Sequence, residues 1–110
     1  MEQITWTDFE KIELRAGTII KVEDFPEARK PAYKVWVDFG ELGVKKSSVQ
    51  ITKLYTKEEL AGKQVVCVLN FPPKQIANFI SEILVTGFET ENGVVLATTE
   101  RKVPDGTKIS

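Results

Sequence analysis

Apolar and polar residues alternate with a period of two along several stretches of the chain, which is the pattern of strands that bury one face. The first two such stretches are residues 14–22 and 32–40. Alternation in the second turns four side chains inward: Tyr33, Val35, Val37 and Phe39. In residues 14–22, the same alternation predicts two faces. One carries Leu14, Ala16, Thr18, Ile20 and Val22, and the other carries Arg15, Gly17, Ile19 and Lys21.

Four later stretches continue this pattern, at residues 44–51, 63–71, 81–89 and 93–99. Each is bounded by turn residues, as strands of small β domains are. Between the last two stretches, Asn92-Gly93 is the dipeptide that best predicts a tight hairpin turn. The C-terminal residues beyond them are rich in turn formers, and we expect an irregular extension there.

One short helix is predicted within the run of strands, at residues 56–63. Thr56 and Glu59 have the spacing of a capping box, and Gly62 suits the end of a helix. A helix between the third and fourth strands favours an OB-fold over a generic small barrel such as an SH3-like fold. We therefore predict an all-β, single-domain protein over residues 1–110, a five-stranded OB-fold barrel with N- and C-terminal extensions.

Residues 1–13 form the predicted N-terminal extension. Trp6, Phe9 and Ile12 recur there at helical spacing, behind a predicted cap at Thr7 or Asp8. A five-stranded barrel has little room for three more large apolar side chains, so we expect them outside the barrel core.

The composition excludes most enzyme chemistry. The 110 residues include no histidine and one cysteine, which removes histidine-based nucleophilic and acid–base sites and the usual zinc sites. Cys67 lies in an apolar run and is predicted to be a buried small side chain. Without a glycine-rich phosphate loop, no catalytic residue, metal or cofactor is expected. No apolar run approaches a membrane span and no signal-like N-terminus is present, so we expect a cytoplasmic protein without membrane insertion.

The net charge of −1 conceals a basic central region. Residues 29–74 carry nine Lys or Arg against four Asp or Glu. Such an excess can attract a phosphate backbone, although lysines also serve simply to solvate a surface. Trp36 shares a strand face with Lys34, a pairing suited to stacking on a nucleobase or gripping an apolar peptide side chain. Packing of Trp36 beneath a loop or in a dimer interface is an equal alternative.

Several short motifs together carry a family resemblance. They are R-x-G-x-I (Arg15, Gly17, Ile19), P-x-A (Pro26, Ala28), D-x-G-E (Asp38, Gly40, Glu41), Y-T-x-E-E-L-x-G-K (Tyr55 to Lys63), N-x-x-P (Asn70, Pro73) and the pair Ser81-Glu82. With them the chain resembles, over essentially its whole length, the CsaA branch of the tRNA-binding domain family. Two departures from the wider family, Ser47-Ser48 and Ile83 in place of the usual glycines, match that branch.

The resemblance implies two functions, which stay open at this point. The first is a chaperone that holds unfolded or precursor polypeptides before export, and the second is a structure-specific tRNA-binding protein. Members of the family are homodimers. The resemblance therefore predicts a self-association interface built from the C-terminal strands and from Trp6, Phe9 and Ile12 of the extension.

The stretch from Asn70 to Val85 is predicted to border the ligand groove, because the connection between strands four and five of an OB-fold lies at one mouth of its binding face. The alternative is that Phe71, Ile76 and Phe79 close the barrel as core residues. Only one of Lys45 and Lys46 can face the groove, and Lys46 is preferred if Val44 begins the strand on that side. The predicted peptide- and tRNA-binding residues are Arg29, Lys30, Lys34, Trp36, Lys46, Asn70, Phe71, Lys74 and Ser81.

Overall fold

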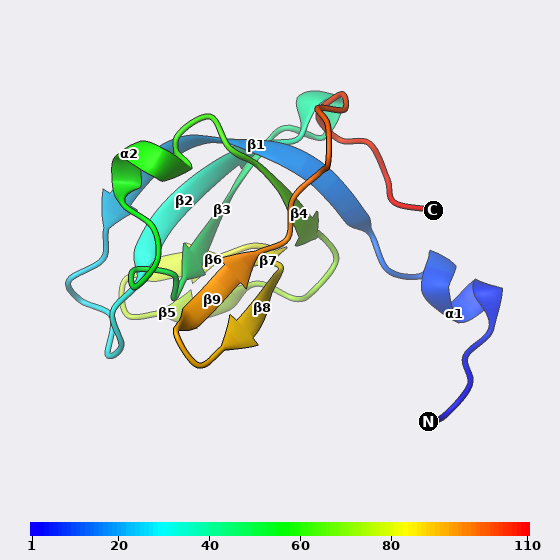
Figure 1. Ribbon diagram of the computed structural model, residues 1–110, viewed down its shortest axis with the longest axis horizontal. Coiled ribbons are helices and arrows are strands. Elements are labelled where there is room, and N and C mark those ends of the chain that lie inside the picture. The colour runs from blue at the N-terminus through cyan, green and yellow to red at the C-terminus, as the bar shows by residue number, and fades with distance from the viewer.

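The computed structural model describes residues 1–110 and contains a five-stranded antiparallel sheet (Figure 1). Its strands are β1 (Leu14–Asp24), β2 (Tyr33–Asp38), β3 (Val44–Val49), β4 (Gln64–Val68) and β7 (Leu84–Val85). They pair in the order β3-β2-β1-β4-β7, and the sheet curls until β3 contacts β7. This nearly closed barrel confirms the predicted OB-fold.

The barrel core is filled by the inward face that alternation predicts for β2. Val35, Val37 and Phe39 are fully buried, and Tyr33 packs against the same cluster. Helix α2 (Lys57–Leu60) adds the buried Leu60 to the core. Its capping box between Thr56 and Glu59 is present as predicted.

Strand β1 departs from the predicted single alternation. Its pairing with β2 shifts register between Ile19 and Lys21, so one extra residue is inserted at Ile20. Such a bulge exchanges the two faces beyond it. Val22 therefore pairs with the buried Val35 and packs against the core, as Ile19 does before the bulge, whereas Ile20 is 53% exposed. The prediction that Val22 shares a face with Leu14 and Ala16 is therefore wrong, and so is the prediction that Lys21 shares a face with Ile19.

The connection after β4 contains a hairpin that alternation did not predict. β5 (Lys74–Ile76) pairs with β6 (Phe79–Ser81), and Ala77 turns the chain with a positive φ of 52°. This hairpin lies across the open side of the barrel beside β3 (Figure 1). Residues 81–89, predicted as one strand, are divided among β6, β7 and β8 (Gly87–Thr90).

Strand β8 forms a second hairpin with β9 (Gly93–Leu96). Thr90 pairs with Gly93, so the two turn residues are Glu91 and Asn92, one position earlier than predicted. Gly93 follows the turn with a φ of 132°, which an L side chain rarely adopts. The hairpin itself is confirmed, and only its centre was misplaced.

The N- and C-terminal segments both lie beyond the same end of the barrel (Figure 1), where Lys108 Nζ donates a hydrogen bond to the Glu10 carbonyl at 3.1 Å. Helix α1 (Trp6–Glu10) is capped by Thr5, whose hydroxyl accepts a hydrogen bond from the Asp8 N–H. The predicted cap at Thr7 or Asp8 is therefore wrong, since Asp8 is the third helical residue that completes the box. A short 3₁₀ helix, η1 (Gly40–Leu42), joins β2 to β3. No helix of the chain combines the length and apolar character that crossing a membrane requires.

Candidate functional site

The outer face of β2 and β3 gathers one aromatic and two basic side chains. Trp36 lies directly opposite Lys46, and Lys34 lies opposite Ser48. Side chains of directly paired residues point to the same side of a sheet. Lys45 pairs instead with the buried Val37, and it takes the opposite face. The register thus places Lys46, and not Lys45, beside Trp36.

A small aromatic cluster lies on this face, separate from the barrel core. Phe25 and Phe79 are buried with ring centroids 5.5 Å apart, and Trp36 meets Phe79 edge-on at 6.0 Å. The β5–β6 hairpin therefore covers one edge of Trp36, which is half-buried. Phe79 belongs to this cluster as a core residue, with Ile76 packed against it.

Three lysine ammonium groups lie over the rings of this cluster. Lys34 Nζ is 4.8 Å from the Phe25 centroid, and Lys46 Nζ is 5.1 Å from that of Phe79. Lys21 Nζ lies 4.6 Å from the Trp36 ring. Cation–π attraction holds such groups in place without neutralising their charge. The face is therefore both apolar and positively charged.

Two residues of this arrangement, Lys21 and Phe25, were not among the predicted site residues. The bulge at Ile20 brings Lys21 level with Trp36, whereas simple alternation places Lys21 with the buried Ile19. A bulge leaves no clear signal in a single sequence, so the position of Lys21 was not accessible from the pattern alone.

Most of the central basic side chains have no acidic partner. Among the nine Lys and Arg of residues 29–74, only Lys57 forms an ion pair, with Asp24 at 2.9 Å. The hydrogen bond that Lys57 Nζ donates to the Asp24 carboxylate raises the pKa of Lys57. Arg29 and Lys30 lie exposed in the loop between β1 and β2. The unpaired lysines leave positive charge free to meet an anionic ligand.

A cavity of about 480 Å³ opens between β3 and the β5–β6 hairpin. Phe71 is 55% exposed at this cavity, in contrast to the buried Phe79. Lys74 stands exposed on β5, opposite Ser81. The lining residues are Ser47, Ser48, Phe71, Pro72, Lys74, Ile76, Ser81, Glu82, Ile83 and Leu84.

Side chains fasten the hairpin to β3 along one wall of this cavity. The Lys46 N–H donates to the Glu82 carboxylate at 3.0 Å, and the Glu82 N–H donates to the Lys46 carbonyl at 2.8 Å. The Ser48 N–H donates to Ser81 Oγ at 3.1 Å, and Ser81 Oγ donates to Ser47 Oγ at 3.3 Å. The hydroxyl of the predicted site residue Ser81 is thus buried and engaged in the fold.

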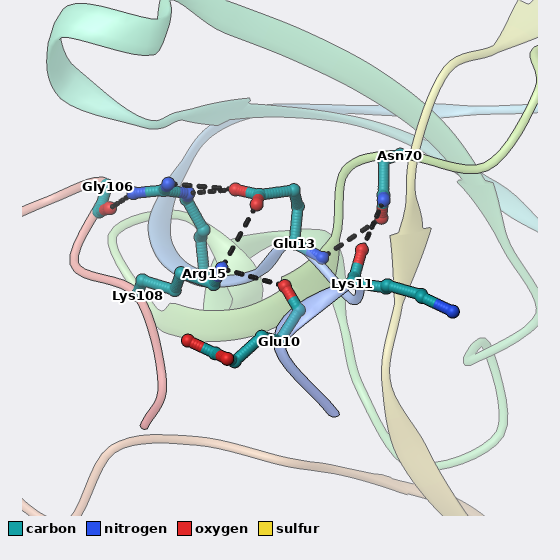
Figure 2. Close-up of polar contacts among 7 residues, drawn as sticks. All are labelled: Glu10, Lys11, Glu13, Arg15, Asn70, Gly106 and Lys108. Carbon is teal, nitrogen blue, oxygen red and sulfur yellow. Dashed lines mark hydrogen bonds and ion pairs between the residues drawn. The ribbon is translucent and has the colours of Figure 1, made fainter. Parts of the chain in front are cut away.

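Asn70 joins the start of the hairpin connection to the N-terminal segment. Figure 2 shows its side-chain amide between two backbone groups of that segment. Asn70 Oδ1 accepts from the Glu13 N–H at 3.0 Å, and Nδ2 donates to the Lys11 carbonyl at 2.7 Å. Asn70 therefore holds the connection in place through both ends of its side-chain amide.

An ion-paired cluster beside Asn70 ties both chain ends to the barrel (Figure 2). The Glu13 carboxylate accepts from Arg15 at 2.8 Å and from Lys108 at 3.1 Å. These two hydrogen bonds lower the pKa of the Glu13 carboxyl, and the one from Arg15 has the larger effect. Arg15 also donates to the Gly106 carbonyl at 2.8 Å. The cluster holds the C-terminal segment against β1, away from the lysine-bearing face.

The predicted contact residues of the extension are distributed as follows. Trp6 is 61% and Ile12 is 41% exposed, whereas Phe9 is half-buried. The Trp6 and Phe9 rings lie 5.4 Å apart, and no residue of α1 is buried. The structure therefore leaves an apolar surface on α1 that the chain itself does not cover.

The single cysteine of the chain is poorly suited to nucleophilic chemistry. Cys67 is fully buried on β4, and burial raises the pKa of its thiol to about 12. A neutral buried thiol is a poor nucleophile. No three His, Cys, Asp or Glu side chains gather to form a metal site. The site offers apolar contact and positive charge, which are typical of a ligand-binding surface.

Comparison with protein families matches residues 14–108 to a family described as "Putative tRNA binding domain". Among curated relatives, methionine–tRNA ligase 1 of Bacillus anthracis is 39% identical over 98% of this chain. Methionine–tRNA ligase of Methanocaldococcus jannaschii is 35% identical over 99% of this chain. The chain spans only 16% and 17% of the length of these two proteins, so it corresponds to one part of each.

Solved structures give matches along their full length. The chaperone CsaA from Bacillus anthracis superposes with a TM-score of 0.92 at 49% identity, over 99% of this chain and 100% of the other. The CsaA chaperone protein from Picrophilus torridus gives 0.92 at 54% identity, over 98% and 100%. A methionyl-tRNA synthetase-related protein from Pyrococcus horikoshii gives 0.86 at 30% identity, over the whole of both chains.

Proposed function

Because the chain belongs to the tRNA-binding domain family, and its fold matches CsaA chaperones end to end, we propose that it is a binding protein without catalytic activity. Its proposed role is that of a molecular chaperone for unfolded polypeptides, including precursors destined for export. Capacity to bind tRNA is the second part of the proposal. The proposed site of action is the cytoplasm, with residues 1–110 acting as one domain.

The observation that carries the chaperone role is the cavity beside Phe71. Its lining combines the exposed Phe71 ring with Leu84, which is 47% exposed. Removing such apolar surface from water is the main favourable term in holding an unfolded chain. Pro72 and Pro73 restrict the backbone beside it, which lowers the entropy lost on binding.

A different observation favours tRNA binding. Lys34 and Lys46 project from one face with no carboxylate partner, and Lys21 lies over Trp36 on the same side. Each phosphate contact made by such lysines releases counterions, which makes binding dependent on salt. Trp36 can stack on a base only through the part of its ring that Phe79 leaves uncovered.

Titration of the protein with tRNA and with an unfolded polypeptide, each at two salt concentrations, tests both roles. Binding to tRNA is expected to weaken with a log–log slope of about 0.7 to 0.9 per phosphate contacted. Capture of an apolar polypeptide is expected to change little between the two concentrations. Failure to bind any unfolded polypeptide at either salt would remove the chaperone role.

Two substitutions separate the roles further. Phe71→Ala removes the exposed ring and should weaken polypeptide binding while leaving tRNA affinity nearly unchanged. Lys46→Ala should lower tRNA affinity and reduce the salt slope by up to about 0.9. Lys45→Ala is the matched control, since the neighbouring lysine takes the opposite face. Circular dichroism checks that each variant is folded, and equal effects of Lys45→Ala and Lys46→Ala on tRNA would contradict the assignment of the face.

A further inference from the structure

The cavity beside Phe71 is the first of three that join along the outer edge of β3. A second cavity of about 450 Å³ shares Ser48 and Leu84 with the first. A third of about 280 Å³ shares Gln50 and Val94 with the second. Together they make a continuous trough, here called the β3 trough, which follows the chain from Ser47 to Lys53.

The hydrogen bonding of the outward backbone groups of β3 changes along this trough. The outward N–H groups of Lys46 and Ser48 are occupied by the side chains of Glu82 and Ser81. Alternation directs the N–H and C=O of Gln50 to the same edge. Neither group of Gln50 makes a hydrogen bond within the protein. The edge is therefore closed by side chains at Lys46 and Ser48 and open at Gln50, just before the turn at residues 52–54. Unpaired backbone groups at a sheet edge are the feature that lets another strand pair with it.

The two ends of the trough differ in chemistry. One end holds Phe71 and the apolar lining of the first cavity. The other end holds Lys30 and Lys53, which both line the third cavity and have no ion-pair partner. An acidic group is complementary to this second end.

We propose that the β3 trough takes an extended polypeptide as an added strand. The backbone of the polypeptide hydrogen-bonds to Gln50, an apolar side chain fills the cavity beside Phe71, and an acidic side chain meets Lys30 and Lys53. Because Ser48 lines the first cavity and Thr52 lines the third, a strand paired residue for residue with this stretch carries its apolar and acidic positions about four residues apart. This inference rests on the proposed polypeptide-binding function and specifies the mode and sequence preference of that binding.

A polypeptide fits this edge better than a nucleic acid does. Gln50 presents both a free donor and a free acceptor, and a peptide backbone satisfies both with its own C=O and N–H. A phosphate group only accepts hydrogen bonds, so it leaves the Gln50 carbonyl without a partner. Strand addition therefore predicts that a bound polypeptide forms new hydrogen bonds with the backbone N–H and C=O of Gln50.

Amide exchange measured by NMR tests that prediction. The probe is a peptide blocked at both ends, with a leucine and a glutamate four residues apart in otherwise neutral sequence, supplied in both chain orders. The free Gln50 amide should exchange fast. With one of the two orders at saturation, its exchange should slow by at least about tenfold, since a new backbone hydrogen bond must open first. No slowing with either order, or slowing by tRNA alone, would overturn the inference.

Charge reversal tests the acidic preference. Lys53→Glu should weaken the glutamate-containing peptide about tenfold or more, because charge-assisted hydrogen bonds contribute most among polar contacts. It should affect a glutamine-containing version much less. Lys102→Glu is the matched control: Lys102 is exposed, lacks an ion pair and lines none of the three cavities. Equal effects of the two substitutions would overturn the assignment of Lys53.

The inference and the proposed function can fail separately. If an unfolded polypeptide binds while the Gln50 amide stays unprotected, strand addition is wrong and the chaperone role stands. If neither an unfolded polypeptide nor either peptide binds, both are wrong. Binding of the peptide with protection of Gln50 and loss of affinity in Lys53→Glu supports both.

Discussion

Gly17 is a residue at which the packing of the barrel leaves no space for a side chain. A Cβ atom at this position would lie 2.6 Å from the ring of Phe39 and 2.6 Å from a methyl of Val37. Gly17→Ala should therefore destabilise the fold by about 1–3 kcal/mol through overpacking, measured by urea denaturation. The double variant with Val37→Ala should be less destabilised than the sum of the single variants, by about 1 kcal/mol. Strict additivity would show that the close approach is not the cause.

Single residues also show where sequence patterns stop being informative. The inward side chains of β2 follow directly from alternation, and Cys67 was rightly predicted to be buried. The roles of Asn70 and Ser81 did not follow, since each bonds to partners at least 33 positions away in the chain. Such long-range hydrogen bonds depend on how the strands meet, and a one-dimensional pattern does not contain that information.

At the scale of elements, α2 offers a direct test of local design. Thr56 Oγ1 accepts from the Glu59 N–H at 3.2 Å, and the helix contributes the fully buried Leu60 to the core. Thr56→Ala should lower the free energy of unfolding by about 1 kcal/mol, because the first turn loses its cap. Thr56→Ser keeps the hydroxyl and should restore most of that loss. Thermal or urea unfolding of the three proteins measures the difference, and equal stability of Thr56→Ala and the parent would contradict the role of the cap.

The elements predicted correctly are those whose signals are local. β1 to β4 follow from alternation, and α2 follows from its capping residues. The β5–β6 hairpin was missed because its turn uses Ala77, an alanine at positive φ, which no turn propensity favours. It is stabilised by tertiary contacts, namely Phe79 in the aromatic cluster and Ser81 against β3. These same contacts shape the cavity, so the hairpin that sequence could not predict is also what builds one wall of the candidate site.

At the scale of the whole molecule, charge is divided between two regions. Acidic and basic groups neutralise one another in the cluster of Glu13, Arg15 and Lys108 at the chain ends. Lys34 and Lys46 over the aromatic cluster, and Lys30 and Lys53 at the end of the β3 trough, lack acidic partners, whereas Lys21 pairs with Glu23 at 3.1 Å. The near-zero net charge therefore does not describe the binding face, whose positive potential should fall with added salt.

The last prediction concerns self-association, which would place two such faces on one particle. Trp6 and Ile12 are exposed on the extension, and Trp6 lines a cavity together with Lys108 and Ile109 of the C-terminal segment. Association with a second copy about a two-fold axis would remove these apolar side chains from water, which favours a dimer. Light scattering at micromolar concentration should give twice the 12.4 kDa of one chain. Trp6→Glu should shift the protein toward the monomer, whereas Leu42→Glu, at an exposed apolar residue of η1, should not.

A dimer carries two copies of the β3 trough, which would have a measurable effect on the binding of long ligands. A chain that reaches both troughs binds the second one intramolecularly, so its apparent affinity rises by avidity. A long unfolded polypeptide should therefore lose much more affinity in Trp6→Glu than a short peptide that fills one trough. Circular dichroism establishes that the variant keeps its fold. Equal losses for the long and short ligands, or a parent protein that scatters as a 12.4 kDa particle, would contradict a bivalent dimer.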